Sequence, residues 1–134
     1  MKRYTRLTKM NFEPLSREQA FDLLLKDGKV YAPVGKVFMG IRCKKRLLCP
    51  LTGTEYIDGE QVPGTFASAL VLGQILVCRD DRRKGLATNA IQWLMEIAAS
   101  LSCSFVRIIS PELKRIAEEC GFSEAYPGVY DYVV

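Results

Sequence analysis

Apolar positions along the chain fall into segments with two different spacings. Between Ala87 and Leu101 they recur every three or four residues, which predicts an amphipathic helix over residues 85 to about 100. The preceding stretch, residues 66–78, is almost continuously apolar and predicts a buried strand, in which Gly73 marks a bulge or a close backbone approach. Residues 105–109 predict a second buried strand, whose Arg107 must reach an edge or a partner.

Two further helices are predicted from their end signals. Ser16 to Gln19 reads as a capping box, and a short helix from there stops at Gly28. Ser110-Pro111 begins the last helix, since proline suits the first helical position. That helix ends at Gly121, and the closing strand follows the Pro127-Gly128 turn within residues 126–134. Its core face consists of Leu113, Ile116, Ala117 and Cys120.

The first half of the chain has a weaker pattern. Residues 1–15 are basic and too irregular for a clear strand. A strand is predicted over residues 36–41, because Pro33 and Gly35 interrupt the preceding segment. The interpretation of the rest is a hairpin or strand end at the basic run 42–46, a returning strand at 47–51, and a loop over 52–65 with a brief pairing around Tyr56-Ile57.

Composition narrows the class of protein. The chain has 134 residues, 49% hydrophobic and 25% charged, which is typical of one globular domain spanning residues 1–134. No apolar run reaches the ~18 residues of a membrane helix, and the N-terminal residues lack the apolar core of a secretory signal. The five cysteines are odd in number and form no C-x-x-C, so we expect reduced thiols and a cytoplasmic location.

Histidine is absent from the chain, which excludes histidine metal ligands and every Ser–His or Cys–His mechanism; no metal site is predicted. The charge is uneven along the sequence. Residues 1–46 carry 12 Lys or Arg against 4 acidic residues, whereas residues 47–134 carry 7 against 11. The basic first third suggests an acidic partner or nucleic acid. An equally good interpretation is that these charges only keep the protein soluble.

The turn between the central strand and helix carries six consecutive charged residues, 79–84, followed by Gly85. The first turn of a helix has backbone N–H groups without intrahelical partners, and the helix dipole adds partial positive charge there. Together with Arg82, Arg83 and Lys84, this predicts a phosphate or pyrophosphate site. The Walker pattern and the dinucleotide fingerprint are both absent.

The run Arg82-Arg83-Lys84-Gly85-Leu86-Ala87 fits the pattern Arg/Gln-x-x-Gly-x-Gly/Ala between a strand and a helix. It resembles the pyrophosphate loop of the GNAT family of N-acetyltransferases. The strand, helix, Gly121-Phe122 and final strand that follow extend the resemblance over residues 69–134. It implies an α/β (α+β) fold with a mixed, mostly antiparallel central sheet, a splayed parallel strand pair and flanking helices.

The resemblance implies that the protein uses acetyl-CoA as a co-substrate to acetylate a primary amine on a protein, a polyamine or a small metabolite. The expected partners are acetyl-CoA, an unspecified amine acceptor and a second copy of the chain as a homodimer, with no membrane. The main chain of the central strand would hold the pantetheine arm, and the loop would hold the pyrophosphate. The implied CoA-binding residues are Leu76, Val77, Cys78, Arg82, Arg83, Lys84, Gly85, Leu86, Ala87 and Thr88.

The catalytic groups do not carry over from the family. Ala117 stands where many members have a tyrosine acid, and Gln74 stands where some have a glutamate base. Ser110, Tyr126, Tyr130 and an ordered water are substitutes, and a backbone N–H of Val77 or Cys78 is the expected oxyanion donor. These departures leave open a second reading, a GNAT-fold module that binds CoA or a macromolecular partner without catalysis. A third reading is a nucleic-acid binder that uses residues 1–46.

Overall fold

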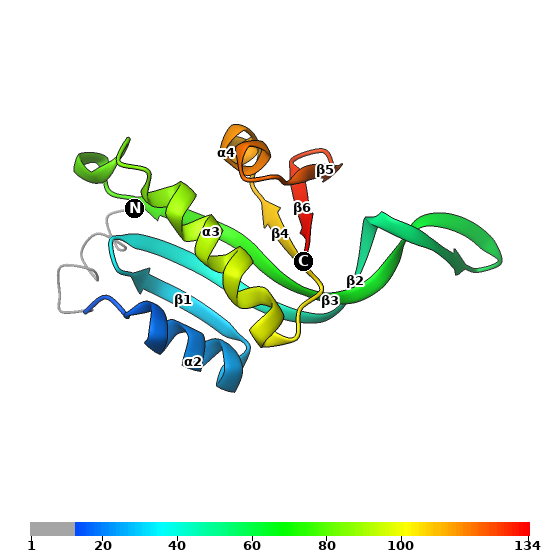
Figure 1. Ribbon diagram of the computed structural model, residues 1–134, viewed down its shortest axis with the longest axis horizontal. Helices are drawn as coiled ribbons and strands as arrows, with labels where there is room; N and C mark the ends of the chain where they lie inside the picture. The colour runs from blue at the N-terminus through cyan, green and yellow to red at the C-terminus, as the bar shows by residue number, and fades with distance from the viewer. Residues whose placement is uncertain (1–12) are drawn as a thin grey trace.

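The computed structural model describes residues 13–134, and the expectation for residues 1–15 lies mostly outside them. The described chain forms one six-stranded sheet in the order β1-β2-β3-β4-β6-β5, with helices beside it (Figure 1). Only β3 and β4 run parallel; every other neighbouring pair in this described sheet is antiparallel. The predicted mixed, mostly antiparallel sheet is confirmed. The elements are α2 (Arg17–Asp27), β1 (Lys29–Val34), β2 (Val37–Ile57), β3 (Glu60–Val77), α3 (Leu86–Ala98), β4 (Phe105–Ile109), α4 (Lys114–Glu119), β5 (Ser123–Tyr126) and β6 (Val129–Val133).

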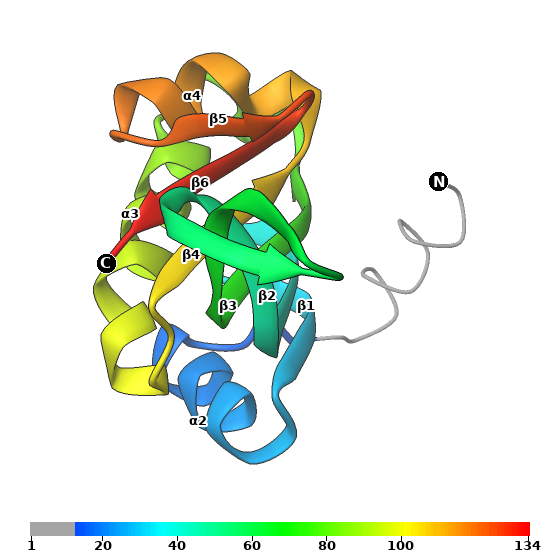
Figure 2. The same ribbon diagram turned by 90° about the vertical axis from the view of Figure 1, so that its right-hand side faces the viewer.

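The main core lies on one face of the sheet. Buried residues of α2, α3 and α4 belong to a single cluster with alternate residues of the strands, and Figure 2 shows α2 and α3 on the same side of the sheet. The cluster takes Leu24 from α2, Leu94 from α3 and Ala117 from α4. The three helices therefore all pack on one face of the sheet, and none of them covers the other face. None of the described helices is both long enough and apolar enough to cross a membrane.

The predicted helix ends are confirmed where the sequence carried a capping signal. The Ser16 hydroxyl accepts the Gln19 N–H at 3.0 Å, and the Gln19 side chain accepts the Ser16 N–H at 2.9 Å. Gly28 ends α2 in the left-handed conformation. The last helix begins with a 3-10 turn at Pro111–Leu113 before α4, and Gly121 follows with φ +95°. The closing segment forms two strands, β5 and β6, joined by the Pro127-Gly128 turn.

Strand β1 was missed by the sequence interpretation. Pro33 suggested a break, but β1 forms the end of the described sheet, where a missing backbone N–H is tolerated. On the side of β1 away from β2, the described part of the chain forms a single isolated bridge, between Leu15 and Val34. The Leu15 N–H donates to the Pro33 carbonyl at 2.9 Å.

The prediction for residues 42–65 was wrong in most respects. The basic run 42–46 is not a turn, because β2 continues through it with a register shift between Lys44 and Leu47. The expected loop at 52–65 is instead the far end of a long hairpin, in which β2 and β3 pair as far as Ile57 and Glu60. Only the brief pairing around Tyr56-Ile57 was anticipated. The turn is Asp58-Gly59, with φ of 51° and 80°, a dipeptide that favours two-residue hairpins.

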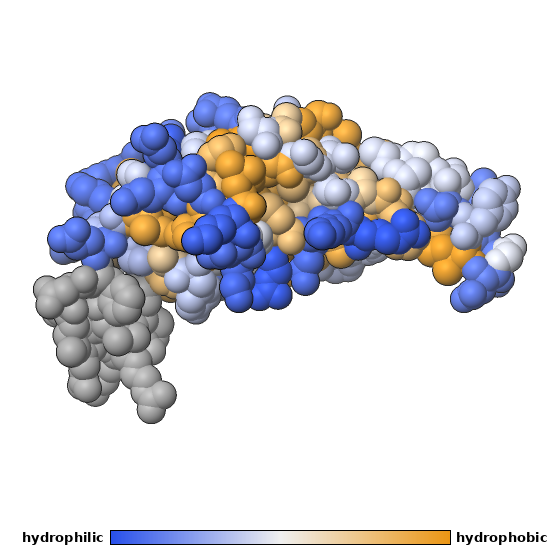
Figure 3. All heavy atoms as spheres, turned by 90° about the horizontal axis from the view of Figure 1, so that it is seen from below, coloured by the Kyte–Doolittle hydropathy of each residue, from blue (hydrophilic) through white to orange (hydrophobic). Residues whose placement is uncertain are grey.

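The end of this hairpin, residues 50–64, extends away from the rest of the molecule and is called the arm (Figure 1). Where it leaves the sheet, the Thr52 and Thr65 hydroxyl groups lie 2.7 Å apart in a hydrogen bond. Leu51 and Ile57 are exposed on it, and apolar atoms are visible near its end in Figure 3. The arm therefore adds surface to the molecule and little to its core.

Candidate functional site

The loop after β3 is held to the sheet by a carboxylate. A 3-10 turn, Arg79–Asp81, follows the strand, and the half-buried Asp81 accepts from Lys84 at 3.5 Å and pairs with Lys36 at 3.9 Å. Lys36 lies in the turn between β1 and β2. The Arg82 Nε donates to the Val77 carbonyl at 3.3 Å. These contacts fix the path of the chain from the end of β3 to the start of α3.

Helix α3 begins with unpaired backbone donors. Gly85 is its N-cap with φ +73°, in the left-handed region that glycine adopts without strain, and no side chain of residues 13–134 caps the helix. The first intrahelical bond runs from the Asn89 N–H to the Gly85 carbonyl at 3.0 Å. The N–H groups of residues 86–88 therefore have no acceptor within the helix. A Cβ at Gly85 would meet nothing within 4 Å, so a ligand can approach this backbone closely.

A cavity of about 670 Å³ opens at this helix start. Seven of the ten predicted CoA-binding residues line it: Val77, Arg82, Arg83, Gly85, Leu86, Ala87 and Thr88. Leu76, Cys78 and Lys84 do not, and the Lys84 ammonium is directed to Asp81.

The opposite wall of this cavity comes from α4, through Arg115, Ile116 and Glu119. Arg115 and Glu119 form an exposed ion pair at 3.4 Å. Sequence reasoning missed this wall, because an exposed Arg–Glu pair one helical turn apart is an ordinary surface pattern.

Next to the cavity, the central sheet opens. The parallel pairing of β3 and β4 ends at Leu72 opposite Ile108, while β3 continues to Val77, and Figure 1 shows the two strands diverging. Residues 73–77 thus have no β4 partner on this edge. The predicted bulge is confirmed: Gly40 pairs with Gln74 and Ile41 with Leu72, which leaves Gly73 unpaired. The result is a segment of main chain without a strand partner on this edge, which leads to the loop before α3; of its groups, the Val77 carbonyl accepts from Arg82 Nε.

The catalytic candidates lie toward the same end of the sheet but on different strands and faces. Ser110 follows β4, and because β3 and β4 are parallel, it lies at the same end of the sheet as Val77. Tyr126 is 40% exposed, with its ring 5.4 Å from the Arg107 guanidinium on the face away from the helices. Tyr130 is buried in the helix-side core at 2% exposure. The structure therefore does not gather these three hydroxyl groups into one constellation.

The two positions that depart from the family have different surroundings. Ala117 is completely buried in the core, so no side chain from this position reaches the opening between β3 and β4. Gln74 is exposed, one residue beyond the bulge. An amide cannot take up a proton usefully, so neither position supplies a general acid or base.

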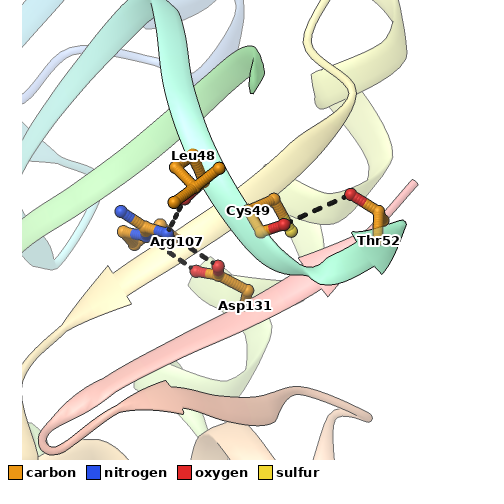
Figure 4. A network of polar contacts seen from close by, with 5 residues as sticks. All are labelled: Leu48, Cys49, Thr52, Arg107 and Asp131. Carbon is orange, nitrogen blue, oxygen red and sulfur yellow. Dashed lines mark hydrogen bonds and ion pairs between the residues drawn. The ribbon is translucent and has the colours of Figure 1, made fainter. Parts of the chain in front are cut away.

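Arg107 was expected to reach an edge or a partner, and its partner in the structure is Asp131. The guanidinium binds both carboxylate oxygens, at 2.8 and 2.9 Å, and donates to the Leu48 carbonyl at 2.8 Å (Figure 4). The hydrogen bond to Asp131 raises the pKa of Arg107, and burial raises the pKa of the neighbouring Cys49 thiol. This network lies under the base of the hairpin, away from the α3 cavity, so we interpret it as structural.

No protein-family model and no curated protein matches this sequence. Solved structures do match it in three dimensions. AtaT complexed with acetyl-methionyl-tRNAfMet aligns with a TM-score of 0.53 at 7% identity, over 84% of this chain and 75% of that one. NAA60 of Arabidopsis thaliana in complex with acetyl-CoA aligns with a TM-score of 0.51 at 13% identity, over 77% and 68%.

The chain has the GNAT fold. The parallel strands β3 and β4, which are joined through α3 and part beyond Leu72, are the splayed pair that the resemblance implied. At these identities, the likeness establishes the fold and leaves the activity to be argued from the site.

Proposed function

We propose that the protein is an acetyl-CoA-dependent N-acetyltransferase. One observation carries this proposal: the edge of β3 at residues 73–77 lacks a strand partner, and the short loop that follows it ends at the uncapped N-terminus of α3. An extended pantetheine arm can pair with such an edge as an added strand. A pyrophosphate can accept from the N–H groups of residues 86–88, supported by Arg82 and Arg83.

The residues present fit this co-substrate. The cavity of about 670 Å³ meets the loop where Gly85 leaves the backbone open, and the charged run 79–84 holds four cations against two acids. AtaT and NAA60, whose complexes hold an acetylated aminoacyl-tRNA and acetyl-CoA, share the fold and support the proposal. The acceptor is a primary amine.

The chemistry asks little of the side chains. Acetyl-CoA supplies a thioester, and the amine nitrogen attacks its carbonyl carbon. Backbone N–H groups near Val77 and Cys78 would stabilise negative charge on the carbonyl oxygen. Because Gln74 and Ala117 provide neither base nor acid, catalysis would rest mainly on positioning. Ser110 is our candidate for donating a proton to the departing thiolate, since it follows β4 at the open edge.

A second candidate function follows from the same two positions. With alanine buried at 117 and glutamine at 74, the protein would bind CoA without transferring the acetyl group. Incubation with labelled acetyl-CoA and a panel of amines separates the two functions. Transfer to any amine supports the enzyme, and CoA binding without transfer supports the binding module.

The donor site is tested by thermal unfolding with and without CoA. A ligand that binds only the folded state at 100 times its Kd stabilises it by about 2.7 kcal/mol, which raises Tm by several degrees. Gly85→Glu should abolish this rise, because a carboxylate would occupy the anion site.

The matched control is Gly59→Glu. Gly59 also has positive φ, +80°, and open space around its missing Cβ, but it lies at the tip of the arm. Both variants should lose similar basal stability, and only the control should keep the rise with CoA. An equal CoA response in both variants would refute the proposed donor site.

A further inference from the structure

The face of the sheet opposite the helices carries a groove of about 520 Å³ across β1, β2 and β3. Six of its lining residues matter here, and we call them the basic groove: Lys29, Tyr31, Gly40, Arg42, Lys44 and Gln74. The strand register arranges them in rows. Tyr31, Gly40 and Gln74 stand side by side on three strands, and Lys29 and Arg42 stand side by side in the next row.

The groove is strongly cationic. Lys29 and Arg42 are direct cross-strand neighbours, and Lys44 lies two residues further along β2, about 7 Å away at the usual strand rise. Like charges directly opposite each other destabilise a sheet. No carboxylate lines the groove, and within residues 13–134 none of these three cations lies within salt-bridge distance of one. The arrangement is what an anionic ligand would stabilise.

An aromatic ring stands beside these cations. Tyr31 is 72% exposed, and its ring lies against two residues of β2. Phe38 packs edge-on at 4.8 Å between ring centroids, and a Cβ at Gly40 would lie only 3.2 Å from the Tyr31 Cδ1. An exposed ring next to positive charge is the combination on which nucleic-acid bases stack while the backbone phosphates are neutralised.

The groove also lies close to the proposed acetyl-transfer site, although the two cavities share no lining residue. Gly73 and Gln74 line its end, and Val77, three residues further along β3, lines the α3 cavity. At about 3.3 Å per residue, the two cavities are roughly 10 Å apart along one strand. A pantetheine arm on the open edge would therefore bring the thioester to the end of the basic groove.

We propose that the basic groove binds a single-stranded nucleic acid that carries the acceptor amine. This inference rests on the proposed acetyltransferase function and specifies its substrate class. In the reaction, the amine nitrogen bonds to the acetyl carbon, the C–S bond of acetyl-CoA breaks, and the proton lost by the amine ends on the CoA thiolate. An acidic protein segment would satisfy the cations but would leave Tyr31 without a flat partner, so nucleic acid fits better.

Binding is measured by fluorescence anisotropy with a labelled single-stranded RNA over a series of salt concentrations. Removing two phosphate contacts with Lys29→Ala/Arg42→Ala should weaken binding at least tenfold at low salt and reduce the slope of log K against log salt by about 1.4. Tyr31→Ala should weaken binding about tenfold with little change in slope, because stacking is not electrostatic. The control, Arg79→Ala/Lys114→Ala, removes the same charge at two exposed positions that line neither the groove nor the α3 cavity, and it should bind like the unaltered protein.

Transfer is measured with the same RNA bearing a terminal primary amine on a short linker. Its kcat/KM should exceed that of the free linker amine at least tenfold, and Lys29→Ala/Arg42→Ala should remove this advantage. The thermal response of that variant to CoA should stay unchanged, because its two positions lie outside the α3 cavity.

Three results would overturn the inference: no RNA binding at low salt, equal binding by the groove and control variants, or displacement of RNA by an acidic peptide that binds more tightly. If these occur while CoA still raises Tm, the donor proposal stands and the acceptor proposal falls. If RNA binds through the groove but CoA never raises Tm, the donor site fails and the acceptor role fails with it.

Discussion

Arg107 and Asp131 form an ion pair that is almost completely shielded from water, with side-chain exposures of 10% and 0%. The pair joins β4 to β6, and a third hydrogen bond reaches Leu48 on β2. Removing one member of such a pair leaves an uncompensated buried charge, which is more harmful than replacing both members.

Arg107→Met should therefore lower the free energy of unfolding by about 3–5 kcal/mol in a urea titration. Arg107→Met/Asp131→Leu should recover part of that loss. If the double variant proves no more stable than the single one, the unpaired Asp131 carries no burial penalty and our interpretation is wrong.

Cys43 and Cys103 form a second residue-scale pair. Interaction with the Cys103 side chain lowers the pKa of Cys43 from 9.0 to about 7, although burial opposes this, and the same interaction raises the pKa of Cys103. Since the folded pKa of Cys43 lies below the unfolded one, the unfolded state binds more protons between these two values. Stability contributed by Cys43 should therefore increase as pH rises from 7 to 9 and be absent below that window.

The measurement is alkylation of Cys43 by iodoacetamide, followed by mass spectrometry across pH. The thiolate is the reactive form, so the rate should reach half its maximum near pH 7. In Cys103→Ala the midpoint should move upward toward that of an ordinary thiol. An identical profile in the two proteins would mean that Cys103 does not act on Cys43.

At the scale of elements, the helices were the most predictable part of the chain. Their signals are local: a capping box at Ser16, a glycine stop at Gly28, and a glycine start at Gly85. Strands β1 and β2 were less predictable. Pro33 and the charged run 42–46 suggest breaks in the local sequence, but pairing with neighbouring strands keeps both segments extended. The Asp58-Gly59 turn was readable and was overlooked among other turn residues.

The base of the arm depends on Gly64. Its φ is +109°, and a Cβ there would lie 2.4 Å from the Cys49 carbonyl oxygen and 2.7 Å from the Pro50 Cα. Gly64→Ala should destabilise the protein by about 2–4 kcal/mol in thermal or urea unfolding, from backbone strain and overpacking together. Gly59→Ala introduces backbone strain, because φ is +80°, but no overpacking, because nothing lies within 4 Å. It should lower the free energy of unfolding by about 1 kcal/mol. Equal losses would show that the hairpin relaxes freely at Gly64.

For the molecule as a whole, the sequence identified the charge imbalance but not its placement. Lys29, Arg42 and Lys44 belong to two strands, and only the register brings them to one face. Likewise, Arg115 of α4 faces the loop before α3 although the two are distant in sequence. The loop itself was predictable, because a strand, a basic turn and a helix start are consecutive. Long-range pairing has no local signature, and for this reason the walls of both cavities came only from the structure.

The two strands of the arm are joined at its base by the hydrogen bond between Thr52 and Thr65. From there the arm points away from the end of the molecule that holds the loop before α3 (Figure 1). Foreign sequence inserted at the Asp58-Gly59 tip would consequently meet neither the sheet nor the two cavities. The tip is thus a natural attachment point for a tag or a fluorophore, which would report on ligand binding without disturbing it.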